Sequence, residues 1–168
     1  MITTGQAIRL GAEQLREIPD PQVDAIALLE KVTGKTPLEL RLHPQDTLTA
    51  EQEERFRSLL LLRSRREPLQ YLLGTQCFYG LEFAVDQRVL IPRPETECLV
   101  EWAMERVPEN GSVLDLGTGS GAIALALAYE RPDAVITAVD ISPGALAIAL
   151  HNAEKLDLTR VRFLESDL

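Results

Sequence analysis

The sequence has 168 residues with 17 Lys and Arg against 26 Asp and Glu, so its net charge is −9 at pH 7. This length accommodates one ordinary domain, or a small domain followed by part of a second. A content of 45% hydrophobic and 26% charged residues is typical of globular chains and excludes a disordered or fibrous one. The longest apolar run, residues 122–129, is too short to span a membrane. The acidic balance argues against direct binding of nucleic acid through bulk positive charge.

The cysteine content bears on both location and metal binding. Cys77 and Cys98 are too few for a disulfide framework, and the N-terminus lacks the apolar segment of a secretory signal. Neither cysteine has a second Cys or a His at the spacing of metal ligands, so no metal site is predicted. These features favour a protein of the reducing cytoplasm.

Residues 1–74 carry the signals of a small helical domain. Asp20 and Thr36 each precede a proline, which is the pattern of an N-cap followed by proline at the first helical position. Thr49 and Gln52 form a capping-box pattern. We expect helices over residues 6–17, 21–33, 37–43, 50–66 and 67–74. Nothing in this bundle indicates a catalytic group.

Residues 75–95 are predicted to form a hairpin and a linker. Aromatic and β-branched residues flank Gly80 within residues 76–85, which favours two short antiparallel strands. Pro92 and Pro94 enclose Arg93 and are expected to keep that segment extended and stiff. A helix is expected from about Thr96 to residue 106.

From residue 112 onward, strand and helix patterns alternate. We expect strands over residues 113–116, 135–139 and 161–164, with helices over 122–130 and 143–156. This order predicts an α/β fold, the βαβαβ beginning of a doubly wound, Rossmann-like parallel sheet. Parallel strands are normally covered on both faces and have further neighbours, so residues 96–168 are expected to form an incomplete domain.

A glycine-rich turn between the first two of these elements is the most informative segment. Gly117, Gly119 and Gly121 allow a sharp turn and a close approach of the backbone to a ligand, next to the N-terminus of a helix. Asp140 follows the next strand, 19 residues after Gly121, where a carboxylate can accept both hydroxyls of a ribose. S-adenosylmethionine and a nicotinamide dinucleotide both fit this pattern, and a purely structural turn is a third interpretation.

Asp115, two residues before the first glycine, favours S-adenosylmethionine. A carboxylate there repels a pyrophosphate and attracts the ammonium group of a methionine moiety. Repulsion between two like charges this close in a partly dry site costs on the order of 1–4 kcal/mol, which is enough to decide between the two ligands. The sequence therefore predicts S-adenosylmethionine as the cofactor.

Other segments share a pattern with a known family. They are Leu-Ile-Pro-Arg-Pro-Glu-Thr-Glu at 90–97, Glu-Pro-Leu-Gln-Tyr at 67–71, the stretch 115–128, and the shorter segments 138–140, 151–153 and 166–167. With them the chain resembles the HemK/PrmC family, the glutamine methyltransferases of peptide chain release factors, over essentially its whole length. The proline-rich segment is far more specific than the glycine turn, which many methyltransferases share.

The resemblance implies a class I S-adenosylmethionine-dependent methyltransferase that modifies the glutamine of the Gly-Gly-Gln motif of a release factor. It implies that the helices of 1–74 help to recognise the release factor and that 75–95 join the two domains. Asp140 would hold the ribose, and Asp167 and Leu168 would contact the adenine. The remaining residues implied to bind the cofactor are Asp115, Gly117, Thr118, Gly119, Ser120 and Gly121. A possible wall of the active site is formed by Arg93, Pro94, Glu95 and Thr96.

The catalytic signature of the family, Asn-Pro-Pro-Tyr, is absent from these residues. We therefore expect no catalytic residue in this chain, no useful turnover by it alone and at most weak cofactor binding. A non-catalytic release-factor-binding module and an adenine-specific methyltransferase of nucleic acid stay open as alternatives.

Several residues have a plainer interpretation beside the functional one. Arg93 and Glu95 can equally form a surface ion pair. Phe78, Tyr79 and Phe83 are expected in the core of the hairpin, with a binding platform as the alternative. Arg63 and the two arginines after it are expected at the solvated end of a helix, with contact to a release factor or RNA as the alternative.

Overall fold

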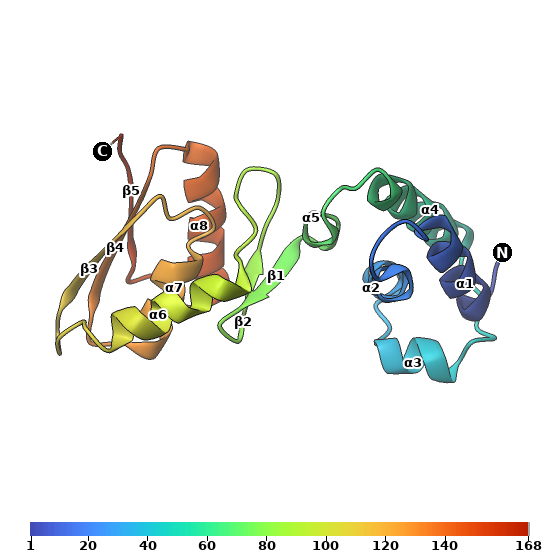
Figure 1. Cartoon of the computed structure of the whole chain (residues 1–168), viewed down its shortest axis with the longest axis horizontal. Coiled ribbons are helices and arrows are strands. Elements are labelled where there is room, and N and C mark those ends of the chain that lie inside the picture. The colour runs from blue at the N-terminus through green and yellow to red at the C-terminus, as the bar shows by residue number, and fades with distance from the viewer. Residues whose placement is uncertain (168) are drawn as a thin grey trace. The chain divides into compact units, whose positions relative to one another are not determined.

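The computed structural model describes residues 1–167 and consists of two compact units, Met1–Leu73 and a second that begins at Gly74. In the first unit, the expected five helices are all present. They are α1 (Thr4–Gln14), α2 (Pro21–Thr33), α3 (Pro37–Leu42), α4 (Ala50–Ser64) and α5 (Leu69–Leu73) (Figure 1). Their ends follow local chemistry, because three of the helices begin with a complete capping box and α2 ends at a left-handed glycine.

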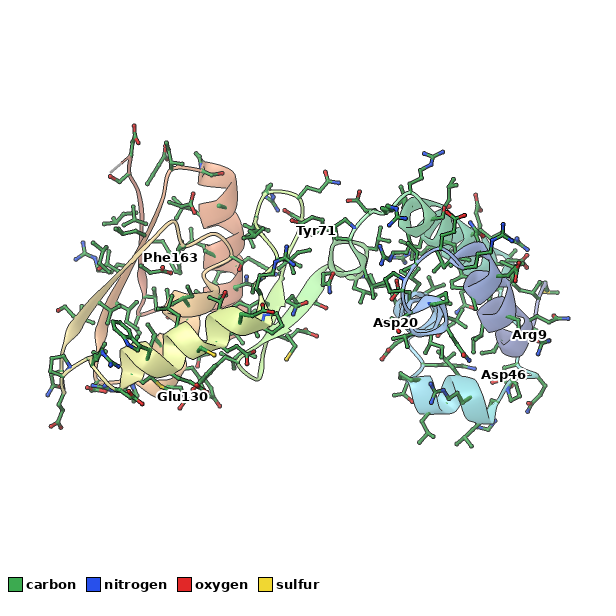
Figure 2. The ribbon with its side chains drawn as sticks, viewed as in Figure 1. Arg9, Asp20, Asp46, Tyr71, Glu130 and Phe163 are labelled. Atoms are coloured by element: carbon green, nitrogen blue, oxygen red, sulfur yellow. The ribbon has the colours of Figure 1, made fainter. Side chains whose placement is uncertain are left out.

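Three details of these helix ends differ from expectation. The first helix begins at Thr4, two residues earlier than predicted, because Thr3 and Gln6 form a capping box. It also ends at Gln14, three residues earlier than predicted. Asp20 occupies the N-cap position of α2 (Figure 2), but its side chain makes no capping hydrogen bond. Proline at the first helical position supplies the start signal there.

The interpretation of Arg63 as a solvated helix end is wrong. Its Nε donates to Asp24 Oδ2 at 2.6 Å, and Nη1 donates to the Glu67 carbonyl at 3.0 Å. The Arg63 and Asp24 side chains are only 16% and 9% exposed. This pair therefore joins α2 to α4 at the edge of a core whose largest buried members are Phe56, Leu15, Leu28, Leu29, Leu40 and Leu60.

The second unit begins with the predicted hairpin, formed by β1 (Thr75–Phe78) and β2 (Leu81–Ala84). Tyr79 and Gly80 connect the strands with φ values of 51° and 73°, as a two-residue type I′ turn requires. Phe78 and Phe83 are fully buried and meet edge to face, with ring centroids 6.1 Å apart. Their expected place in the core is confirmed, whereas Tyr79 lies in the turn and is only partly buried against that core.

The proline-rich segment is extended only in part. Arg93 has extended backbone angles, but Pro94–Thr96 form a 3₁₀ turn, η1, and α6 follows over Glu97–Met104. The expectation of a fully extended segment is wrong because Pro94 already has the φ angle of a first helical residue. Arg93 and Glu95 form no ion pair with each other within residues 1–167, so that interpretation is not supported.

The predicted βαβαβ order is confirmed. Its elements are β3 (Ser112–Leu116), α7 (Ala122–Glu130), β4 (Val135–Asp140), α8 (Pro143–Lys155) and β5 (Arg162–Glu165). The three strands are parallel and lie in the order β3-β4-β5, as the ribbon shows (Figure 1). Because the chain moves across the sheet in one direction through right-handed crossovers, α7 and α8 cover the same face.

The two faces of this sheet differ in burial. Ile136 and Ala138 of β4 are buried in the core with α7. On the opposite face, Leu114, Leu116 and Leu164 are 56%, 54% and 44% exposed. The sheet is therefore covered on one side only, which agrees with the prediction that these three strands are part of a larger sheet. Across residues 1–167, no helix combines the length and the apolarity that a membrane crossing requires.

Candidate functional site

The site forms where β3 and β4 end, and the loop from β3 to α7 is its central element. Gly117, Gly119 and Gly121 all have positive φ, at 73°, 56° and 80°. A Cβ on Gly117 or Gly119 would meet nothing within 4 Å, so these two residues border open space. A Cβ on Gly121 would lie 3.2 Å from the Ala149 Cβ, so that end of the loop packs tightly on α8. The loop thus has an open half and a closed half.

Backbone hydrogen bonds fasten the loop to the neighbouring strand. The amides of Gly117 and Thr118 both donate to the Val139 carbonyl, at 2.8 and 2.9 Å. Thr118 and Ser120 are buried although they lie in a loop. The two sequence-predicted residues between the glycines therefore support the loop, while Gly117 and Gly119 form its accessible surface.

Asp140, at the end of β4, is held by two backbone amides. Its Oδ2 accepts from the Gly119 amide at 2.8 Å, and its Oδ1 accepts from the Ser142 amide at 2.9 Å. A carboxylate has about four acceptor positions. Asp140 thus retains acceptor capacity for two hydroxyl groups, and its orientation is fixed by both neighbours.

Asp115 lies under the first turn of α7. Its Oδ2 accepts from Thr118 Oγ1 at 2.7 Å, and the Ala124 backbone amide also donates to this carboxylate. Burial raises the pKa of Asp115, the hydrogen bonds from Thr118 and Ala124 act in the opposite direction, and the charge of Asp140 adds to the increase. The N-terminal end of α7, which attracts anions in many proteins, therefore already carries a carboxylate.

A cavity of about 140 Å³ adjoins the open half of the loop. Residues 90–93 and Thr96 line one part of it, and Gly117–Ser120 line another. Of the predicted active-site wall, Arg93 and Thr96 lie at the cavity, whereas Pro94 and Glu95 are not among its lining residues. Phe78 also lines it, a position that the sequence indicated only as hairpin core.

Asp167, one of the two predicted adenine contacts, follows β5 at the same edge of the sheet. Ser166 donates its amide to the Asp140 carbonyl at 3.2 Å, so the end of β5 runs beside Asp140. Asp167 follows directly and is exposed. Leu168 lies outside the described residues.

Comparison with known proteins agrees with this architecture. Residues 6–74 match the PrmC N-terminal domain, and residues 108–168 match a methyltransferase domain. Fold and site therefore agree with a chain that has a PrmC-type N-terminal domain followed by a methyltransferase domain.

Curated relatives match most of this chain. Release factor glutamine methyltransferases of Salmonella typhimurium, Escherichia coli and Chlorobaculum tepidum are 49%, 45% and 44% identical over 91%, 95% and 90% of this chain. The chain spans 56%, 58% and 54% of the length of these relatives. The resemblance to the HemK/PrmC family that the sequence indicated is confirmed.

One solved structure is similar to a smaller part of the chain. A methyltransferase from Geobacter sulfurreducens, solved in complex with S-adenosyl-L-homocysteine, is 33% identical and covers 45% of this chain and 30% of its own. Its TM-score is 0.38.

Proposed function

We propose that this chain supplies the substrate-recognition domain and the cofactor loop of a peptide chain release factor N5-glutamine methyltransferase that uses S-adenosylmethionine. The observation that carries the proposal is the position of Asp115 at the N-terminal turn of α7, where its carboxylate accepts from Thr118 and Ala124. Similarity to curated release factor glutamine methyltransferases supports the choice of substrate.

The geometry of the loop favours a cationic ligand over a pyrophosphate. In a dinucleotide site the helix N-terminus and the loop amides bind the phosphates. Here the Gly119 amide donates to Asp140, and Asp115 lies at the start of α7. A pyrophosphate would meet two carboxylates, whereas the ammonium group of a methionine moiety would meet an opposite charge.

The residues present fit S-adenosylmethionine as the cofactor. Gly117 and Gly119 leave space for a ligand that a side chain would fill. In the proposal, Asp115 faces the ammonium group, Asp140 accepts from the ribose hydroxyls, and Asp167 lies on the adenine side, with Leu168 as an apolar wall. The cofactor would supply a methyl group on a sulfonium, while Arg93 and Thr96 border the space beside the loop.

The proposed substrate is the side-chain amide of the glutamine in the Gly-Gly-Gln motif of a release factor. An amide nitrogen is a weak nucleophile, so catalysis depends on alignment and on electrostatic placement of the amide. In the family this is the role of Asn-Pro-Pro-Tyr, which residues 1–168 do not contain. We propose that residues 1–168 therefore recognise the release factor and the cofactor without turning them over.

The domain roles and the setting follow the same proposal. The helical residues 1–74 would contact the release factor, and residues 96–168 would carry the cofactor loop. Residues 75–95 would join these two domains. The protein would act in the cytoplasm, where release factors work, and would contact protein rather than nucleic acid.

Methyl transfer in a chimera tests this function. The chain alone, with a release factor and S-adenosylmethionine labelled in its methyl group, should give background incorporation. A chimera that continues with the corresponding C-terminal residues of the Escherichia coli relative should label the Gly-Gly-Gln glutamine, as mass spectrometry of the digested release factor would show. A folded chimera that binds S-adenosylhomocysteine but labels DNA adenine, or nothing, would contradict the proposed substrate.

A further inference from the structure

Asn152, on α8, is a buried polar side chain outside the proposed cofactor-binding residues. It is completely buried, yet its amide makes three hydrogen bonds. Oδ1 accepts from the Ala84 amide at 2.7 Å, and Nδ2 donates to the carbonyls of Ala84 at 3.1 Å and Ser120 at 2.9 Å. One side chain thus connects the hairpin, α8 and the glycine loop.

The contact with Ala84 resembles the pairing of a neighbouring strand. Val85 donates its amide to the Gly74 carbonyl, so the polar groups of Ala84 point away from β1, toward the outer edge of the hairpin. Asn152 satisfies both of these groups. These two hydrogen bonds therefore connect α8 to the outer edge of the hairpin.

The third hydrogen bond of Asn152 connects α8 to the glycine loop. Ser120 lies between Gly119 and Gly121, and its side chain is buried. Its carbonyl accepts from Asn152 on the closed half of the loop, where Gly121 also packs against Ala149. This carbonyl belongs to the peptide bond between Ser120 and Gly121, and the Gly121 amide of the same peptide donates to the Thr118 carbonyl at 2.9 Å. Fixing the orientation of this peptide therefore restricts Gly121 directly and holds closed the turn that contains Gly119, where glycine otherwise has wide conformational freedom.

We propose that Asn152 is a positioning residue for the glycine loop. It holds the Ser120 carbonyl against the hairpin edge and thereby keeps Gly119 in the left-handed conformation that directs its amide to Asp140 and leaves the open half of the loop accessible. The inference extends the proposed cofactor site, but the conformation of the loop can be tested without any ligand.

The chemistry of the amide group explains why asparagine is required here. The position needs one acceptor and two donor hydrogens at the reach of one methylene, which the Asn side chain supplies. Leucine has similar volume and would leave three backbone groups without partners. An ionised aspartate would accept from the Ala84 amide but would oppose the two carbonyl oxygens, whereas its protonated form could donate to one of them.

Amide hydrogen exchange of the full chain, without ligand, tests the proposal. In Asn152→Leu, exchange at Gly119 and Gly121 should be roughly tenfold faster or more, the equivalent of one unsatisfied buried group. In Asn152→Asp, the protection factors of the same amides should rise as the pH falls, because protonation restores a donor. The wild-type chain should show no such rise.

Ile148→Ala provides the matched control. Ile148 is also buried on α8, but its apolar side chain makes no hydrogen bond. This variant should lose stability throughout the second unit while the loop stays as protected as the rest of that unit. The positioning role would be overturned if amide exchange were accelerated equally and uniformly in Ile148→Ala and Asn152→Asp. It would also be overturned if exchange in Asn152→Asp did not depend on pH. If Asn152→Leu does not fold, the aspartate variant alone decides the result.

A titration with S-adenosylhomocysteine, followed by NMR, separates this inference from the proposed function. The dissociation constant should increase about tenfold in Asn152→Asp at neutral pH and less than about twofold in Ile148→Ala. Saturable binding of NADH in place of S-adenosylhomocysteine would count against the proposed cofactor, while the exchange data would still decide the role of Asn152. Equal weakening in both variants would reduce Asn152 to a residue of general stability.

Discussion

Replacing Gly117 by alanine separates ligand contact from backbone strain, because the chain contains a matched control. Gly117 and Gly80 both have φ of 73°, and a Cβ on either would meet nothing within 4 Å. Both residues lie in the second unit, one in the glycine loop between β3 and α7 and the other in the type I′ turn. The two substitutions thus impose the same strain without a clash.

The expected loss of stability can be derived from the backbone angle. A non-glycine residue in the left-handed region costs about 1–2 kcal/mol. Alanine restricts the unfolded chain and recovers about 0.4–1 kcal/mol. The net loss of roughly 1 kcal/mol lowers the melting temperature of a domain of this size by about 4–8 °C. Gly117→Ala and Gly80→Ala should therefore melt at similar temperatures.

Ligand binding should distinguish the two variants. In an NMR titration with S-adenosylhomocysteine, which detects weak binding, Gly80→Ala should keep the wild-type dissociation constant within about twofold. Gly117→Ala should raise it at least about tenfold, because the added methyl occupies space proposed for the ligand. Equal affinities in the two variants, at equal losses of stability, would refute the assignment of this loop as the cofactor site.

Three further predictions concern the buried charges and the closed half of the loop. Arg63→Ala, which leaves the buried Asp24 without its partner, should destabilise the helical unit by about 3–5 kcal/mol in urea unfolding, against less than about 1 kcal/mol for the exposed Arg57→Ala. A loss below that of Arg57→Ala would show that the pair contributes nothing. The raised pKa of Asp115 means that it is protonated earlier on acidification than an ordinary aspartate, and a cationic ligand needs its ionised form. The affinity for S-adenosylhomocysteine should therefore fall as the pH is lowered through that pKa, less steeply in Asp115→Asn; identical pH profiles would contradict this. Gly121→Ala should cost about 1–3 kcal/mol more than Gly80→Ala in urea unfolding, because its Cβ would crowd α8; equal losses would contradict the packing.

Elements defined by short-range chemistry were predictable from the sequence. The capping boxes at Thr36 and Thr49, the glycine after α2 and the alternation from residue 112 all act within a few residues. The glycine loop could be predicted equally well, since the positive φ of Gly117 and Gly119 is a property of the turn itself. For the same reason the βαβαβ order was predictable.

Features that depend on tertiary contacts were not predictable in this way. The partner of Arg63 lies 39 residues earlier, and Asn152 contacts residues 68 and 32 positions away. Neither has a periodic or local signal, because the geometry exists only after helices pack. The 3₁₀ turn at Pro94 was missed for a different reason, since proline fits both an extended segment and the start of a helix.

The choice of ligand tests the central claim most directly. The chain, labelled with ¹⁵N, can be titrated with S-adenosylhomocysteine and separately with NADH while the amide signals of Gly117, Gly119 and Asp140 are observed. The carboxylates around the loop predict saturable shifts of these signals with S-adenosylhomocysteine and none with NADH. Saturable shifts with NADH, and none with the adenosyl amino acid, would contradict the proposed role of Asp115 and the assignment built on it.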